Sequence, residues 1–181
     1  MEFSPFKYET VEELKKDIIK NKLDICLSEN MTLLNEPVHV DGFDLSNALA
    51  VNPMEGCDGN TDGSPSELTI RRYKRFSAGG AGLLWFEAVS VVPEGRANPK
   101  QLWITKNNVN AFKDIFNTII ETAHRNYGNS HTPLCIMQLT HSGRFSRPID
   151  QSDPIIAYYN PVLNERMNLD KSYPVITDEA L

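Results

Sequence analysis

The chain has 181 residues, and its 18 Lys and Arg against 24 Asp and Glu give a formal net charge of −6. This length suffices for one domain with a hydrophobic core but is short for a complete (β/α)8 barrel, which takes about 250 residues. With 40% hydrophobic and 23% charged residues, the composition excludes a disordered chain, and the acidic balance without a Lys/Arg run argues against nucleic-acid binding.

Residues 1–45 are interpreted as an N-terminal appendage to a domain that spans 46–181. The capping box T-V-E-E begins at Thr10, and apolar residues follow at helical spacing, so we predict a helix over 11–21. The β-branched alternation of VHVDGFDL at 38–45, centred on Asp-Gly, predicts a short hairpin.

The β/α rhythm begins with the apolar run at 48–51, which predicts a buried strand. The sequence S-P-S-E then predicts a helix with Ser64 as N-cap, a proline at its first position and Glu67 as the capping acid. The adjacent glycines at 79–80 predict the end of this helix. The almost entirely apolar run 81–89 is typical of a strand that is covered on both faces.

A second helix is predicted over 107–127, with Gly128 as its end, and a third strand over 134–139. The expected core face of that helix consists of Val109, Phe112, Phe116, Ile119 and Ala123. Strand, helix, strand, helix, strand is the alternation that builds a parallel sheet. The segment of about 37 residues after the third strand shows no clear element.

The chain ends on Thr177, Asp178, Glu179 and two further residues, a pattern typical of the start of a helix. We therefore expect the sequence to be the N-terminal portion of a longer α/β protein, with about three βα units preceded by a helix and a short hairpin.

Two motifs are weak matches to binding sites. The run D-G-N-T-D-G at 58–63 opens like a calcium loop, but Thr69 stands where a bidentate glutamate is needed, so a tight turn is favoured. The glycines at 79–82 lie between a helix and a strand, whereas phosphate-binding loops follow a strand and open a helix. The four histidines lack metal-ligand spacing, and no metal site is predicted.

The sequence lacks the features that are typical of membrane and secreted proteins. No apolar stretch approaches the roughly 20 residues of a membrane span, and the N-terminus has no apolar signal-peptide core. The three cysteines are odd in number and widely spaced, which favours reduced thiols over disulfides or zinc ligands. The sequence therefore predicts a cytoplasmic protein that binds neither membranes nor nucleic acid.

Polar residues cluster where the three strands end, which is where parallel β/α folds bind their ligands. These strand ends are Pro53-Met54-Glu55, Glu87-Ala88 and the run from Gln138 to Arg144. The Gln138 amide can pair with the edge of a heteroaromatic ring, or it can merely satisfy loop backbone. The sequence by itself leaves both interpretations open.

At these residues the sequence resembles the old yellow enzyme family, the NADH:flavin oxidoreductases that bind FMN in a (β/α)8 barrel. It looks closest to the branch near dienoyl-CoA reductase and trimethylamine dehydrogenase. The matching pieces are AVNPMEG at 50–56, DGSPSELTIRRY at 62–73, AGGAGLLWFEAVSVVPEGR at 78–96 and MQLTHSGR at 137–144. They occur in the family's order, and the resemblance covers roughly 35–181.

The resemblance implies five cofactor-binding residues. Pro53 and Met54 match positions whose backbone packs on the flavin ring, Ala88 lines the ring, and Gln138 matches the glutamine that binds its pyrimidine edge. Glu55 departs from the family pattern, which often has Thr or Cys there. If ionised and close to the ring, Glu55 would disfavour the anionic reduced flavin and lower its potential.

Two further residues are implied at the substrate side. Thr140 matches a position that faces the substrate, and Arg144, in the H-x-G-R turn with His141, either approaches the active site or anchors the loop. The residues that hold the substrate carbonyl, the proton donor and the flavin phosphate site lie on later strands in this family. No catalytic residue is therefore predicted within the chain.

The resemblance implies an FMN-dependent oxidoreductase that takes hydride from NADH or NADPH and passes it to an activated alkene, a small-molecule substrate. The chain alone is expected to be catalytically incomplete. Two alternatives stay open: a fragment of an amine dehydrogenase or demethylase flavoprotein, and a non-catalytic partial barrel that associates with further copies through its open sheet edges.

Overall fold

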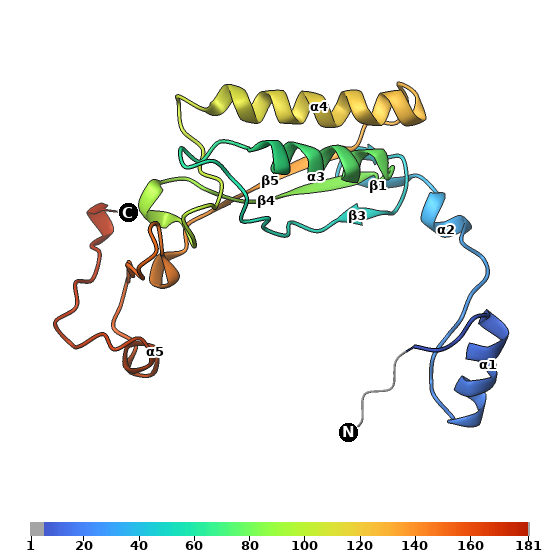
Figure 1. Ribbon diagram of the computed structural model, residues 1–181, viewed down its shortest axis with the longest axis horizontal. Coiled ribbons are helices and arrows are strands. Elements are labelled where there is room, and N and C mark those ends of the chain that lie inside the picture. Colours follow the sequence, from blue (N-terminus) through green and yellow to red (C-terminus); the bar gives the residue numbers. More distant parts are fainter. Residues whose placement is uncertain (1–5, 181) are drawn as a thin grey trace. The chain divides into compact units, whose positions relative to one another are not determined.

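The computed structural model describes residues 6–180 and divides into two compact units, one up to Leu33 and one from Leu34 onward (Figure 1). The first unit contains α1 (Val11–Lys20), which confirms the predicted N-terminal helix. Its N-cap is Thr10, whose side chain accepts a hydrogen bond from the backbone N–H of Glu13 at 3.3 Å. This cap satisfies one of the free N–H groups with which every helix begins.

The predicted hairpin is confirmed and lies in the second unit. Strands β1 (Val38–Val40) and β2 (Phe43–Leu45) pair antiparallel, and the four-residue helix α2 (Thr32–Asn35) comes just before them. At the turn, Asp41 has φ 46° and Gly42 has φ 86°. Positive φ at both positions is what a two-residue hairpin turn requires, and Asp-Gly tolerates it. The domain limits 1–45 and 46–181 stay a prediction.

The second unit is built on a three-stranded parallel sheet with the order β3-β4-β5. In chain order its elements are β3 (Ala50–Val51), α3 (Glu67–Ala78), β4 (Leu83–Ser90), α4 (Val109–Tyr127) and β5 (Leu134–Thr140). Strand β4 is central and pairs in parallel with both neighbours. Helices α3 and α4 lie on the same side of the sheet (Figure 1), so the predicted β/α alternation is confirmed.

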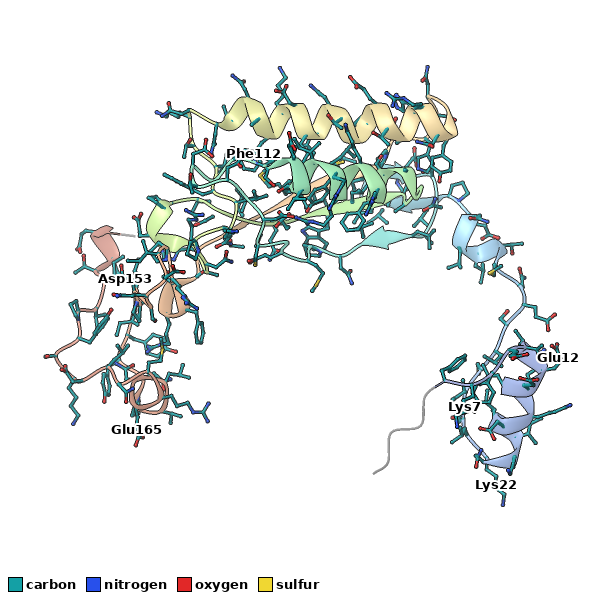
Figure 2. All side chains as sticks on the ribbon, in the orientation of Figure 1. Lys7, Glu12, Lys22, Phe112, Asp153 and Glu165 are labelled. Atoms are coloured by element: carbon teal, nitrogen blue, oxygen red, sulfur yellow. The ribbon has the colours of Figure 1, made fainter. Side chains whose placement is uncertain are left out.

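The core lies between these two helices and the sheet. Phe86 of β4 stacks on Tyr73 of α3 with 4.1 Å between ring centroids, and Phe112 reaches the same cluster from α4 (Figure 2). Every second residue in the first half of β4 places a large apolar side chain in this layer. The strand therefore packs against both helices. The buried cluster consists of Tyr73, Leu84, Phe86, Val89, Leu102, Phe112, Ile115 and Ile119.

A β-bulge interrupts β4 near its C-terminal end. The register with β5 shifts between Phe86 and Ala88, so Glu87 is an extra residue in the strand. As a result Phe86 and Val89, three residues apart, both join the core under the helices. Ala88 pairs with Gln138 of β5. The bulge therefore places Ala88 on the face opposite the helices and leaves Glu87 on the helix side.

The predicted N-cap of α3 is wrong by two residues. Ser66, not Ser64, caps the helix: its side chain accepts from the backbone of Leu68 and Thr69, and Thr69 completes the capping box. Ser64 is instead bound into the preceding turn, where its N–H and hydroxyl both donate to Asp62. A serine that closes a turn is not free to begin a helix.

Three further expectations need correction. Strand β4 is not covered along the whole of both faces, because Trp85 is 42% exposed. Val109 is 44% exposed, whereas Ile115, which was not expected in the core, is 1% exposed. Val109 is the first residue of α4 and lies beyond the edge of the sheet-facing stripe.

The segment after β5 does contain short elements. They are η2 (Gly143–Phe145) and α5 (Pro161–Arg166), the latter capped by Asn160 with a proline in its first turn. The expected helix start near the C-terminus forms the single turn η3 (Asp178–Ala180). Of the helices within residues 6–180, none has the length and apolarity needed to cross a membrane.

Candidate functional site

The candidate site lies at the C-terminal ends of β3, β4 and β5, which a parallel sheet brings to one edge. Ala88 and Gln138 are register partners there, and Ser90 pairs with Thr140 two residues further along the strands. Ala88 is 7% exposed, while Gln138 and Thr140 are half-buried. The structure thus brings together predicted site residues from two neighbouring strands.

Gln101, which the sequence reasoning missed, lies at the centre of this edge. It is 1% exposed, and its side-chain Nε2 lies 3.3 Å from the Ala88 carbonyl oxygen and 3.3 Å from Thr140 Oγ1. The same nitrogen is 3.4 Å from Glu55 Oε1. Gln101 therefore contacts residues from the ends of all three strands. Nothing in the local pattern of a loop glutamine indicates such burial.

Glu55 is held by side-chain amides at the strand-end edge. Asn98 Nδ2 lies 3.4 Å from Glu55 Oε2, on the other side of the carboxylate from Gln101. Burial raises the pKa of Glu55, and the negative charge of Glu87 raises it further. The carboxylate that departs from the family pattern is therefore in a setting that disfavours its ionised form.

Cys57 lies beside the same amide, with its Sγ 3.4 Å from Asn98 Nδ2. Burial raises the pKa of its thiol, and the charges of Glu55 and Glu87 add to the effect. Reactive cysteines need the opposite, a lowered pKa beside positive charge. The surroundings of Cys57 thus do not supply the positive charge that activates a cysteine.

The other predicted residues after β3 differ in exposure. Pro53 is half-buried, whereas the Met54 side chain is 74% exposed and its backbone N–H donates to the Asn52 carbonyl at 2.9 Å. What the resemblance implies for Pro53 and Met54 concerns their backbone. Their role, like those of Glu55, Ala88 and Gln138, stays a prediction.

Glu87 lies at a strand end but turns away from the site. Its carboxylate is 1% exposed, accepts from the Gly56 N–H at 2.9 Å, and lies 2.8 Å from Arg72 Nη2. The same guanidinium nitrogen donates to Asp58 Oδ1 at 2.8 Å. A Cβ added at Gly56 would lie 2.0 Å from Arg72 Nη2, so a larger residue there would displace the guanidinium from this cluster. This ion cluster fixes the loop after β3 against α3.

The calcium-like run forms a turn instead of a metal loop. The Asp58 carboxylate is occupied by Arg72 and by the Thr69 hydroxyl at 2.7 Å, and the Gly63 N–H donates to the Asn60 carbonyl at 2.9 Å. The carboxylate that would open a calcium site is thus already neutralised. Across residues 6–180, no group of three or more His, Cys, Asp or Glu side chains is placed to hold a metal ion.

Arg144 anchors the loop that follows β5. Its Nη1 donates to Asn164 Oδ1 at 2.7 Å and its Nη2 to the Tyr158 carbonyl at 2.9 Å. His141 accepts from the Gly143 N–H at 2.9 Å within the same turn. These contacts match the loop-anchor alternative for Arg144. Substrate binding by Arg144 and Thr140 stays a prediction.

The polar groups at this edge could pair with the edge of a planar heteroaromatic ring. The half-buried Gln138 side chain makes no hydrogen bond to any of residues 6–180, which leaves both its donor and its acceptor free. Its register partner Ala88 has only a methyl side chain and is 7% exposed. Gln138, Ala88 and the backbone at Pro53 and Met54 are the groups that could hold a flavin.

Comparison with known proteins agrees with this description. No family model matches the chain. An NADPH dehydrogenase from Halalkalibacterium halodurans is 31% identical over 121 residues, which is 65% of this chain and 32% of that protein. The chain thus spans about a third of the length of this relative.

Solved structures share the fold. The old yellow enzyme homologue from Zymomonas mobilis has a TM-score of 0.57 at 22% identity, with 70% of this chain and 33% of that one covered. The old yellow enzyme from Trypanosoma cruzi has a TM-score of 0.54 at 22% identity, with 72% and 36% covered. The fold shared with these structures is therefore that of part of a β/α barrel. The resemblance to the old yellow enzyme family is confirmed over these regions.

Proposed function

We propose that the chain is part of an FMN-dependent NAD(P)H oxidoreductase of the old yellow enzyme type. In this proposal it supplies the first three βα units of a (β/α)8 barrel, and β3, β4 and β5 form one wall of the flavin site. The whole protein would reduce an activated alkene, and the chain alone would not turn over. The similarity to an NADPH dehydrogenase supports the reductant, and the shared fold supports the barrel.

The observation that carries the proposal is the free amide of Gln138 next to Ala88 at the C-terminal edge of the sheet. Had Gln138 served only to satisfy loop backbone, its amide would hydrogen-bond to the loop after β5. Instead that loop is held by Arg144, through Asn164 and Tyr158. A half-buried amide with a free donor and acceptor suits the pyrimidine edge of a flavin.

A bound flavin would supply hydride chemistry, and the residues of this chain would set its surroundings. The Gln138 amide would fix the ring's rotation by pairing with adjacent donor and acceptor atoms. Ala88, which has only a methyl group, would allow the ring to lie close to the sheet. Glu55, held by Gln101 and Asn98, would determine how much negative charge stands near the ring.

The proposal is tested by titrating the 181-residue chain with FMN and following backbone and side-chain amide signals by NMR. We expect weak binding, in the millimolar range, because one wall supplies only a few of the contacts that a whole site would make. The shifts should be confined to the residues around Glu55, Ala88 and Gln138.

Gln138→Leu is the variant that should lose these shifts, since leucine keeps the bulk but not the amide. Gln151→Leu, an exposed glutamine in the loop after β5, is the matched control and should titrate like the parent chain. Shifts elsewhere, or none at any FMN concentration, would contradict the flavin wall. Stoichiometric FMN binding with NADH or NADPH oxidation by the chain alone would contradict its catalytic incompleteness.

A further inference from the structure

Gln101 lies in the loop between η1 (Pro93–Gly95) and α4, yet it is among the most deeply buried polar residues described. Its Oε1 accepts from the Ala97 N–H at 2.5 Å, which fixes the orientation of the amide. Its NH₂ group is thereby turned toward the strand ends. Burial of an amide is costly unless its polar atoms are satisfied, so each of these contacts contributes to holding the side chain.

The NH₂ group of Gln101 has two hydrogens but three acceptors within reach. They are the Ala88 carbonyl at 3.3 Å, Thr140 Oγ1 at 3.3 Å and Glu55 Oε1 at 3.4 Å. Because the three distances are nearly equal, the two hydrogens are shared among the acceptors. A stronger bond to one acceptor must weaken the bond to another.

We propose that Gln101 is a positioning residue that couples the Glu55 carboxylate to the Thr140 hydroxyl across the Ala88 carbonyl. The inference rests on the proposed function, because these three residues are the ones expected to face flavin and substrate. An ionised Glu55 draws a Gln101 hydrogen toward itself and releases Thr140 Oγ1 to accept from a ligand. A neutral Glu55 returns that hydrogen to Thr140.

Other groups also act on Glu55 and must be separated from Gln101. Glu87 of β4 repels its charge, and the thiol of Cys57 lies nearby. Asn98 donates to the far oxygen of the carboxylate but, unlike Gln101, makes no hydrogen bond to Thr140 or Ala88. Asn98 therefore provides a matched control for the loss of one amide contact to Glu55.

The test is an NMR pH titration of the Glu55 side chain in the 181-residue chain without flavin. Gln101→Glu keeps the shape and the acceptor for Ala97 but exchanges the NH₂ group for an oxygen, so the Glu55 midpoint should rise by about one pH unit. Thr140→Val removes one competing acceptor, so the midpoint should fall by a few tenths of a unit.

Asn98→Ala should raise the Glu55 midpoint while leaving the pH dependence of the Ala88 and Thr140 amide signals as in the parent chain. In Gln101→Glu the part of that pH dependence that follows the Glu55 midpoint should be lost. An unchanged Glu55 midpoint in Thr140→Val would overturn the coupling, even if Gln101→Glu did not fold. A fall of the midpoint in Gln101→Glu would overturn it as well.

The same variants separate this inference from the proposed function. FMN shifts that persist in the parent chain while Thr140→Val leaves Glu55 unaffected would overturn the coupling and leave the flavin wall intact. The expected Glu55 changes without FMN shifts at the strand ends would overturn the flavin wall and leave the coupling intact.

Discussion

On the helix side of the parallel sheet, Phe86 is 1% exposed and stacks on Tyr73, whereas its neighbour Trp85 on the other face is 42% exposed. The helix side is closed by large apolar contacts within the chain. The other face ends in Ala88, Gln138 and Thr140, with a free amide among them. The difference separates residues that hold the fold together from residues that are available to a ligand.

The largest expected effect on stability comes from disrupting the packing between the sheet and its helices. Phe86→Ala should lower the free energy of unfolding by about 3–5 kcal/mol, because it removes a fully buried ring and leaves a cavity. Trp85→Ala, the adjacent residue on the open face, should cost less than about 1 kcal/mol. Urea unfolding of both variants measures the contrast, and equal losses would show that the open face is covered in solution.

A second large effect is expected at the ion cluster of Arg72, Glu87 and Asp58, which joins the end of β4 and the loop after β3 to α3. Arg72→Met should cost about 3 kcal/mol, because it leaves the Glu87 carboxylate buried without its counter-charge. The exposed neighbour Arg71 serves as control, and Arg71→Met should change stability by less than about 0.5 kcal/mol.

Adding Glu87→Gln to Arg72→Met should recover part of the lost stability, since a neutral amide does not need the guanidinium. Urea unfolding of the double variant provides this comparison. A double variant that is less stable than Arg72→Met alone would show that Glu87 contributes through its other contacts, among them the Gly56 N–H.

A smaller effect is expected at the start of α3. Ser66→Ala should cost about 1 kcal/mol by removing the N-cap, and Ser64→Ala should cost less because Ser64 closes only the preceding turn. Thermal unfolding of the two variants side by side makes the comparison. A larger loss of stability in Ser64→Ala than in Ser66→Ala would indicate that Ser64 is the N-cap.

Periodicity predicted most of the helix side from the sequence. The spacing of Phe112, Ile119 and Ala123 placed α4, and the apolar run through Phe86 placed β4. The sequence did not predict features that depend on the pairing of one element with another. The bulge at Glu87 depends on the register with β5, which a single strand's sequence does not encode.

The site was only partly predictable for the same reason. The C-terminal ends of strands can be located from the sequence, so Ala88, Gln138 and Thr140 could be predicted as candidates. Gln101 lies in a loop, and its importance comes from burial among three strand ends that are distant in sequence. The calcium-like run at Asp58 shows the converse, since its carboxylate is taken by an arginine on α3.

The smallest expected effect concerns the pH dependence at Glu55. Burial, and then the charge of Glu87, raises the pKa of Glu55 above its ordinary value of 4.5 in the folded chain. An acid with a raised folded pKa destabilises the fold once the pH exceeds its unfolded pKa, because ionisation is easier in the unfolded chain. Well below the unfolded pKa, at about pH 3, the carboxyl is neutral in both states and the penalty vanishes.

Glu55→Gln should therefore be more stable than the parent chain at pH 7 and equal to it at about pH 3, with the gain developing as the pH rises from the unfolded pKa through the folded pKa. Urea unfolding at both pH values measures the difference. The gain stays small because Glu55 is exposed enough for water to screen its charge. A gain at about pH 3 that disappears at pH 7 would contradict the sign, and would mean that the amides of Gln101 and Asn98 stabilise the ionised form more than burial and Glu87 disfavour it.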